Sequence, residues 1–182
     1  MIDRGFRELV LTGIHLGHYG VDFNRGKPKQ DWTRLSHLVR EIAKLPGDFR
    51  IRLSSIEATE VTRELIDVFC EFPDRVCPHM HISMQSGSDA VLRRMRRRWG
   101  SERFIDRCRL LKSALDLPAI TTDIIVGFPG EPKISFWKRV RLHAKLAFLR
   151  STFSPSVRVE AHQRQTWRSK YRREKNKGVD AT

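Results

Sequence analysis

The sequence predicts an α/β fold built on a parallel sheet, and three observations lead to this prediction. Four β-then-α units follow one another along the chain, the order typical of parallel sheets with helical crossovers. Residues 120–126 form a β-branched run with one charged residue, Asp123, and resemble strands buried on both faces. Glycine and polar residues gather where the predicted strands end. In parallel folds ligands bind at that edge, so these residues are candidates for a site.

The four predicted strands are apolar segments that end in polar or glycine-bearing loops. They cover residues 7–15, 49–57, 79–84 and 120–126. The helices between them are predicted from apolar residues at helical spacing. The first covers 33–45, with Leu35, Leu38, Val39, Ile42 and Leu45 inward, and the second runs from its cap Thr62 to about Phe72. A third begins near Ser88, and a fourth covers 101–115 with Ser101 as its cap and Phe104, Ile105, Cys108, Leu111 and Leu115 inward.

Composition narrows the class of protein. The chain has 182 residues, 40% of them hydrophobic, enough for one core. It has no apolar run of 18 or more residues, so we expect no membrane span. No apolar signal region follows Met1, and the cysteines Cys70, Cys77 and Cys108 are odd in number. We therefore expect a cytoplasmic protein with free thiols.

The histidines do not predict a metal site. His79 and His81 alternate on one strand and so share a face, but no third ligand lies near them in the sequence. His15 and His18 flank Gly17 in a loop, where surface histidines are common. We expect satisfied polar positions and no bound metal.

Three loops permit either a structural or a ligand-binding interpretation. The segment from Gly127 to Glu131 is a tight turn, or it lets the backbone approach a planar ring. The segment from Gln85 to Gly87 is a polar loop, or it aims donors at a hydroxylated ligand. The segment from Ser54 to Glu57 is a helix cap, or it supplies ligand contacts.

Taken together, these motifs resemble the radical-SAM tRNA methylthiotransferases of the threonylcarbamoyladenosine type. The resemblance rests on residues 11–20, 52–57, 79–95 and 123–131, in the order and spacing of that family. It implies a partial (βα) radical-SAM barrel that lacks its first and last strands. It also implies S-adenosylmethionine and [4Fe-4S] clusters as cofactors, and tRNA as the partner.

The resemblance also assigns the cofactor-binding residues. Thr12 and Gly13 would meet the methionyl part of S-adenosylmethionine, and the turn from Val126 through Gly127 to Glu131 would meet the adenine. Ser55, Glu57 and Gln85 would contact its polar and ribose portions, with Ser86 and Asp123 close by. For RNA contact the candidates lie in a basic run: Arg94, Arg96, Arg97 and Arg98.

The sequence departs from the family at several positions. Ala58 stands where the family favours proline, Ser83 and Met84 where it favours Pro-Leu, and Arg96 where it favours asparagine. The family holds its cluster with three cysteines in a CxxxCxxC motif, which this sequence lacks. We therefore expect this chain to bind no cluster and to be inactive as it stands.

The strong positive charge is unevenly placed. Residues 132–182 hold 14 lysines and arginines and 3 acidic residues, a net charge of +11. Most of the chain's net charge of +14 therefore lies in this stretch. Codons chosen to encode the segments that the family has in this region can be read one base out of frame. They then encode Ser-Thr-Phe-Ser-Pro-Ser and Ala-His-Gln-Arg-Gln-Thr-Trp, which are the residues found at 151–156 and 161–167. The prediction is a radical-SAM core at 1–131 and an out-of-frame, disordered basic tail at 132–182. The strand at 120–126 would then be an exposed edge.

The predicted function is insertion of a methylthio group into the modified adenosine next to the tRNA anticodon. Two alternatives stay open. One is a non-catalytic nucleic-acid-binding protein that uses its basic residues. The other is a different radical-SAM enzyme with the same barrel.

Overall fold

The computed structural model of the chain describes residues 2–129 and 150–155. The strands are β1 (Glu8–Leu11), β2 (Arg50–Leu53), β3 (Ser55–Glu57), β4 (His79–Ser83), β5 (Ala119–Val126) and β6 (Arg150–Pro155). The α-helices are α1 (Leu35–Ala43), α2 (Arg63–Glu71), α3 (Asp89–Arg94) and α4 (Ser101–Ala114). Short 3₁₀ turns are η1 (Ile2–Arg4), η2 (Leu16–His18), η3 (Asp22–Asn24), η4 (Lys29–Asp31) and η5 (Ala58–Glu60).

All the described strand pairs are parallel, which confirms the predicted α/β class. β1 pairs with β2, and a second sheet has the order β3–β4–β5–β6. The predicted strand 49–57 is interrupted at Ser54, whose backbone N–H donates to Leu11 O at 2.9 Å. One segment of chain thus pairs with β1 before Ser54 and with β4 after it. The two sheets therefore meet along this segment as a partial barrel.

The strands bury alternate residues. In β4 the buried Met80 and Ile82 alternate with partly exposed His79, His81 and Ser83. The same period of two continues on the neighbouring strands, because successive side chains of a strand point to opposite faces. One face of the sheet is therefore apolar and the other is polar. Residues 120–126 are not buried on both faces as expected, because Thr121, Asp123 and Ile125 are partly exposed.

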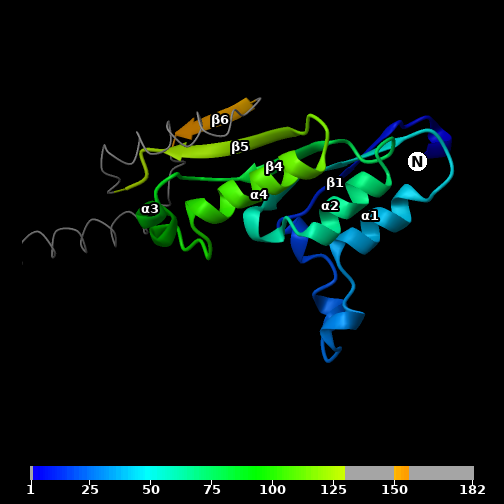
Figure 1. The fold of residues 1–182 in the computed structure, drawn as a ribbon, viewed down its shortest axis with the longest axis horizontal. Coiled ribbons are helices and arrows are strands. Elements are labelled where there is room, and N and C mark those ends of the chain that lie inside the picture. The colour runs from blue at the N-terminus through cyan, green and yellow to red at the C-terminus, as the bar shows by residue number, and fades with distance from the viewer. Residues whose placement is uncertain (1, 130–149, 156–182) are drawn as a thin grey trace, which may run out of the picture.

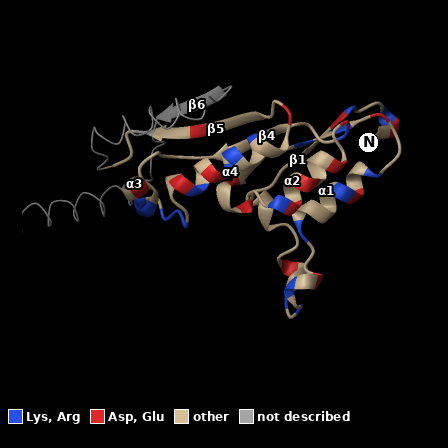
Figure 2. Cartoon of the chain, in the orientation of Figure 1, with Lys and Arg blue, Asp and Glu red and all other residues tan. Residues whose placement is uncertain are grey.

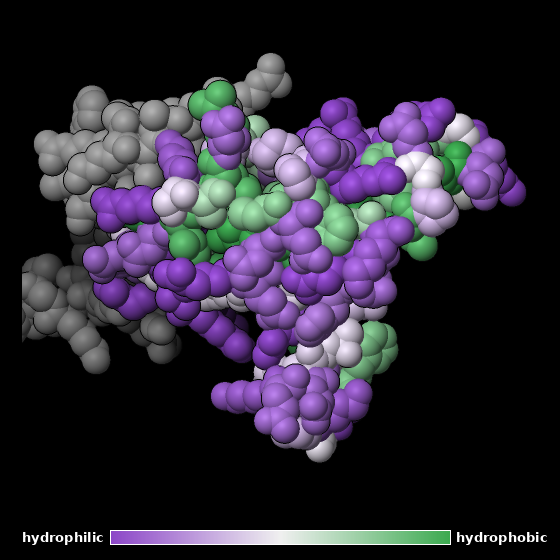
Figure 3. Space-filling model, turned by 45° about the vertical axis from the view of Figure 1, so that its right-hand side comes forward, coloured by the Kyte–Doolittle hydropathy of each residue, from purple (hydrophilic) through white to green (hydrophobic). Residues whose placement is uncertain are grey.

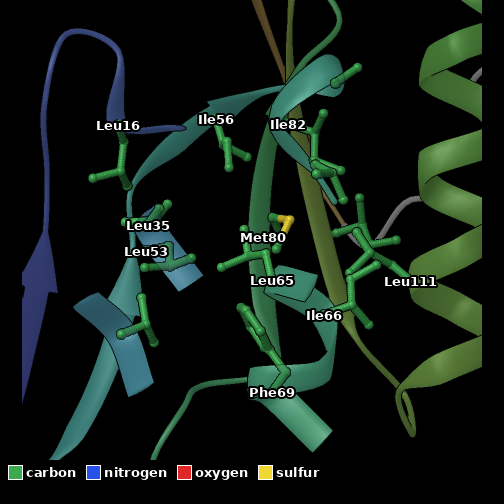
Figure 4. Close-up of a cluster of buried hydrophobic side chains, with 14 of the residues drawn as sticks. Leu16, Leu35, Leu53, Ile56, Leu65, Ile66, Phe69, Met80, Ile82 and Leu111 are labelled. Atoms are coloured by element: carbon green, nitrogen blue, oxygen red, sulfur yellow. The ribbon is translucent and has the colours of Figure 1, made fainter. Parts of the chain in front are cut away.

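Helices cover the apolar face (Figure 1). Side chains of α1, α2 and α4 pack with those of the strands into one cluster, which Figure 4 shows in close-up. Members of this cluster with at most 2% of their surface exposed include Val39, Ile51, Leu53, Leu65, Met80, Ile82, Phe104 and Leu111. This core fixes the strands, and so the loops at their C-terminal ends.

The helix predictions are largely confirmed, with two corrections. Thr62 caps α2, and its Oγ1 accepts a hydrogen bond from Leu65 N at 3.2 Å. α4 begins at Ser101, but Ser101 is not its cap; its N–H donates to Asp89 Oδ1 at 2.8 Å, a contact from a distant residue. Leu45 is 47% exposed, because α1 ends two residues earlier, at Ala43. The predicted inward position of Cys108 is confirmed, since this residue is fully buried.

The sheet continues beyond β5, contrary to the prediction. β6 pairs with β5 from Thr121↔Arg150 to Val126↔Pro155, so β5 is not an exposed edge. Residues 150–155, inside the range expected to be disordered, form this strand. The remainder of that range lies outside the described residues. The sequence missed this strand because Arg150–Pro155 shows no clear apolar alternation.

The segment that carries η3 and η4 projects from the body of the molecule (Figure 1). Figure 3 shows mostly hydrophilic surface on that projection and a hydrophobic patch on the body between more polar borders. In the part of the chain that the structure describes, no helix is long and apolar enough to cross a membrane.

Candidate functional site

The C-terminal ends of β1, β3, β4 and β5 bring most of the predicted cofactor-binding residues to one edge. Leu11 and Leu53 form the last pair of β1 and β2. Thr12 and Gly13, which follow β1, therefore lie at the same end of the sheet as Ser54 and Ser55, which follow β2. Glu57 is paired with Ser83, and Gln85 forms an isolated bridge with Ile124. Gly127 directly follows the last residue of β5. The positions predicted separately from sequence thus belong to one edge of the sheet.

Two glycines leave open space at this edge. A Cβ atom at Gly13 would meet nothing closer than Leu16 Cα, at 3.7 Å. Gly127 has φ +72°, and a Cβ there would have no atom within 4 Å. Both glycines are exposed. A ligand could therefore approach the backbone closely at both positions, as the sequence predicted.

Gln85 has a backbone conformation unusual for its residue type. Its φ is +63°, in the left-handed region that favours glycine. Two hydrogen bonds of 2.9 Å to β5 hold it there, from Gln85 N to Asp123 O and from Ile125 N to Gln85 O. Backbone strain of this kind concentrates at functional sites, which agrees with the ligand-binding interpretation of this loop.

Two predicted residues have structural partners. Ser86 is fully buried, and its Oγ accepts a hydrogen bond from Ser88 N at 3.2 Å, so it shapes the turn after β4. Glu57 accepts a hydrogen bond from Arg97 Nη1 through Oε1. An ion pair of this kind fixes the direction of the carboxylate at the edge of the site.

The basic run divides into two groups. Arg94 donates to Pro129 O and lies 5.7 Å from the ring centre of Phe128, while Arg97 pairs with Glu57. These two side chains therefore tie α3 and the following loop to the site. Arg96 and Arg98 are exposed, and Figure 2 shows blue positions on α3 and on the loop after it.

The polar face of the sheet carries a network that the sequence did not reveal. His81 places Nδ1 2.9 Å from Thr121 Oγ1 and Nε2 3.2 Å from Asp123 Oδ2. Thr121 Oγ1 also lies 3.3 Å from His79 Nε2. Burial is the main cause that lowers the pKa of His79, and the nearby Arg52 and His81 add to it. The predicted sharing of a face by His79 and His81 is confirmed, but their partners come from β5.

A second cluster lies on the same face at β1 and β2. Arg52 Nε donates to Glu8 Oε1 at 2.8 Å, and Arg50 Nε donates to Glu8 Oε2 at 2.6 Å. The hydrogen bond from Arg52, followed by that from Arg50, lowers the pKa of Glu8 to about 2. Alternation within each strand could have placed these residues on one face. Their pairing needed the register between the strands.

The remaining predicted site residues have less defined settings. Asp123 lies within β5, and its side chain is 42% exposed beside His81. Val126 ends β5, and Glu131 lies outside the described residues.

The cysteines do not fit an iron–sulfur cluster. Cys70 is exposed on α2, whereas Cys77 and Cys108 are buried. Burial raises the pKa of the Cys108 thiol to about 12, which keeps it protonated. A cluster needs converging thiolates. These three residues do not supply them.

Comparison with known proteins identifies the class. The model of the radical SAM superfamily matches residues 3–143. Since this is most of the chain, the chain belongs to the radical SAM superfamily.

Curated relatives narrow the similarity. The chain is 43% identical to the threonylcarbamoyladenosine tRNA methylthiotransferase of Thermotoga maritima, over 82% of this chain and 32% of that protein. The chain is 40% identical to the enzyme of the same name from Bacillus subtilis, over 88% of this chain and 36% of that protein. The tRNA-2-methylthio-N(6)-dimethylallyladenosine synthase of Corynebacterium diphtheriae is 37% identical, over 87% of this chain and 31% of its own length. The chain thus spans about a third of the length of these relatives.

Solved structures support the fold. The radical S-adenosylmethionine methyltransferase TsrM of Kitasatospora setae superposes with a TM-score of 0.64 at 13% identity, over 87% of this chain and 29% of that one. Coproporphyrinogen III oxidase of Escherichia coli superposes with a TM-score of 0.56 at 16% identity, over 69% of this chain and 28% of that one. The predicted radical-SAM fold is confirmed. The alternative of a non-catalytic nucleic-acid-binding protein receives no support from these similarities.

Proposed function

We propose that this chain forms the S-adenosylmethionine-binding part of a cytoplasmic tRNA methylthiotransferase. The reaction is insertion of a methylthio group into the modified adenosine next to the anticodon. One observation carries the proposal. Relatives named as tRNA methylthiotransferases align with 82–88% of this chain at 37–43% identity. Their names differ in the modified adenosine, so the proposal does not choose between the two substrates.

The open edge of the sheet fits S-adenosylmethionine. Gly13 and Gly127 leave room for close approach, and Ser55, Glu57 and Gln85 supply polar groups from adjacent strands. In this proposal Thr12 and Gly13 hold the methionyl part, the polar side chains hold the ribose, and the turn from Val126 to Glu131 holds the adenine. The cofactor, when bound, supplies the radical chemistry of the superfamily. The residues of this chain bind it, orient it and limit its access to water.

The polar face next to this edge is suited to a nucleoside. His81 and Asp123 offer ring nitrogen and carboxylate groups that can hydrogen-bond a base or a ribose. The exposed Arg96 and Arg98 are placed for phosphate contact, whereas Arg94 and Arg97 act within the protein. Of the four arginines predicted to bind RNA, we therefore propose Arg96 and Arg98 for that role.

A graded glycine series tests the cofactor site. A Cβ atom at the exposed position 13 would meet no protein atom closer than 3.7 Å, and Gly13→Val extends from that point, so the fold is expected to tolerate it. If S-adenosylmethionine approaches the backbone there, a clash of about 1–3 kcal/mol weakens its binding roughly 5–150-fold. Gly13→Ala is expected to have a smaller effect in the same direction. Calorimetric titration with S-adenosylmethionine and S-adenosylhomocysteine measures both.

Ala114→Val, at the exposed end of α4, is the matched control and is expected to leave the affinity unchanged. Equal affinities for Gly13→Val, Ala114→Val and the unsubstituted chain would show that the cofactor does not bind at this edge.

The proposed organisation places a radical-SAM core at residues 1–131 and an out-of-frame stretch at 132–182. The match to the superfamily extends to residue 143, 12 residues past this boundary, so support for the proposal comes from the stretch's basic composition, 14 of the 35 basic residues. Sequencing the DNA across codons 125–182 tests the proposal. A shifted frame is expected to restore a sequence similar to the relatives. If neither alternative frame does so, the proposal fails.

A further inference from the structure

Three side chains with metal-binding atoms meet beside the body of the fold, outside the set of residues assigned to the cofactor. His15 and His18 come from the loop after β1, which contains η2, and Glu60 ends η5 after β3. One ligand atom from each lies within 4.8 Å of the others. The two segments are far apart in the sequence, so only the fold brings these residues together.

Glu60 is the most informative member of this group. Its side chain is 7% exposed, and its Oε1 atom is buried with no hydrogen-bond partner among the described residues. The other carboxylate oxygen, Oε2, accepts a hydrogen bond from Glu57 N at 2.9 Å. Burying a charged oxygen without a hydrogen bond is costly, and a bound cation offsets that cost.

The geometry of the three groups is close to that of a metal site. His18 Nε2 lies 3.5 Å from Glu60 Oε1, and the rings of His15 and His18 stack with their centres 5.0 Å apart. Donor atoms about 2.0–2.1 Å from a tetrahedral Zn²⁺ are separated by about 3.3 Å. The His18–Glu60 pair already has nearly this spacing. The third donor, on the exposed His15, lies within 4.8 Å of the other two.

The loop is built to approach Glu60 closely. Gly17 lies between the two histidines, and a Cβ atom there would be 2.4 Å from Glu60 Cβ. Leu16 is buried at 7% exposure and anchors the loop to the core. Glycine at position 17 and leucine at 16 thus hold both imidazoles next to the buried carboxylate.

A second histidine–glutamate pair in the chain shows the contrast. His37 Nε2 lies 3.3 Å from Glu64 Oε1, a similar distance. Glu64, however, also accepts hydrogen bonds from Arg34 Nη1 at 2.9 Å and from Ser36 Oγ at 2.8 Å. Its oxygens are satisfied by protein donors, whereas Glu60 Oε1 is not.

We propose that His15, His18 and Glu60 form a site for a divalent transition-metal cation of the Zn²⁺ type. Two imidazole nitrogens and one carboxylate oxygen are the donor set of many three-ligand zinc sites, which keep a further position for water or another ligand. The loop that carries the histidines begins at Thr12 and Gly13. The proposal does not depend on cofactor binding there.

Titration of the metal-free 182-residue chain with Co²⁺, followed by displacement with Zn²⁺, tests the site. We expect one Co²⁺ per chain with the visible absorption of low-coordinate Co²⁺, lost when Zn²⁺ is added. Removing even an outer partner of a metal site weakens binding about 10–100-fold, so loss of a direct ligand is expected to cost at least about 100-fold. Glu60→Gln keeps an oxygen for Glu57 N and removes the charge. His15→Asn and His18→Asn alter exposed side chains, so they leave the core unchanged.

His37→Asn is the matched control, and it is expected to leave the affinity for Co²⁺ unchanged. Cys70→Ser, at the exposed cysteine, controls for thiolate binding and is likewise expected to have no effect. Circular dichroism of each variant is measured as well, to check that the substitution leaves the chain folded. Absence of stoichiometric binding, or equal affinity in Glu60→Gln, His18→Asn and the unsubstituted chain, would overturn the proposal. So would loss of binding in Cys70→Ser.

Discussion

The two faces of the same strands differ in what covers them. On one face, Met80 and Ile82 of β4 and Ile120 and Ile124 of β5 are almost completely buried. On the other face, His81 of β4 is partly exposed, and hydrogen bonds join it to the partly exposed Thr121 and Asp123 of β5. Within the described ranges, the helices α1, α2 and α4 pack against the apolar face.

The comparison separates stability from chemistry. Side chains on the covered face gain free energy by leaving water, so they stabilise the fold. Those on the polar face remain accessible and are held by a few directed hydrogen bonds. Substitutions on the two faces should therefore change different properties of the protein, and the expected effects below run from the largest to the smallest.

Phe104→Ala is expected to be the most damaging. Phe104 of α4 is fully buried in the cluster, and truncating such a side chain costs about 3–5 kcal/mol of unfolding free energy. Val10→Ala, at a position of β1 that is 54% exposed, is the control, with a change within about 0.5 kcal/mol. Urea unfolding measures both. Similar costs at the two positions would mean that the two faces do not differ as described.

Thr122→Val and Thr121→Val compare adjacent residues on opposite faces. Thr122 is fully buried, donates to Ile82 O at 2.7 Å and accepts from Met84 N at 3.0 Å. Valine would remove both hydrogen bonds from this buried position, at a cost of about 1–3 kcal/mol. Thr121→Val is expected to cost less, because its partly exposed partners, His79 and His81, can bond water. Urea unfolding again measures the difference, and a larger cost at Thr121 would contradict the assignment of the faces.

Gln85→Gly is expected to raise the stability while weakening cofactor binding. Glycine accepts a φ of +63° without strain, a gain of up to about 1 kcal/mol before the entropy of the unfolded chain is counted. Leu117→Gly is the control, since Leu117 has φ +42° and is 88% exposed away from the site. Thermal melting and titration with S-adenosylmethionine separate the two effects. A loss of affinity in both variants would point to a general change in the fold.

Glu8→Gln is expected to change the dependence of stability on pH. The pKa of Glu8 in the folded protein is about 2, below its ordinary value of 4.5, because Arg52 and Arg50 bind its carboxylate. A lowered pKa stabilises the fold above pH 4.5, and this contribution is lost as the pH falls from 4.5 towards 2. Glu8→Gln should therefore flatten that part of the urea-midpoint profile.

Glu41→Gln is the control for this acid profile. Its carboxylate is paired with Lys44 on the surface of α1, and the hydrogen bond from Lys44 also lowers its pKa. We expect a smaller change there, since exposed pairs within a helix contribute little. Equal flattening in the two variants would show that the two arginines give Glu8 no special role.

Much of the fold was predictable because it depends on local patterns. The β-branched run at 120–126 predicted β5, and the cap Thr62 predicted the start of α2. Both signals depend on neighbouring residues alone. The order of β and α units gave a parallel sheet. β6 was not found, because its six residues become a strand by pairing with β5 rather than through their own composition.

The candidate site was predicted in its positions more than in its contacts. The turns at Gly13, Gln85 and Gly127 could be read from the sequence, since chain order places them after strands. The partners Arg97 for Glu57 and Asp123 for His81 are 40 and 42 residues away. Local spacing carries no information about such pairs.

The sequence by itself determined the α/β class, the main helices and the strand ends at which polar residues gather. It did so because hydrophobic period and turn residues act over a few positions. Tertiary structure alone decided that β2 and β3 divide at Ser54, that Asp89 rather than Ser101 supplies the acceptor at the start of α4, and that Glu60 comes to lie beside His15 and His18. The physical reason is that strand register and packing join residues that are remote in the chain.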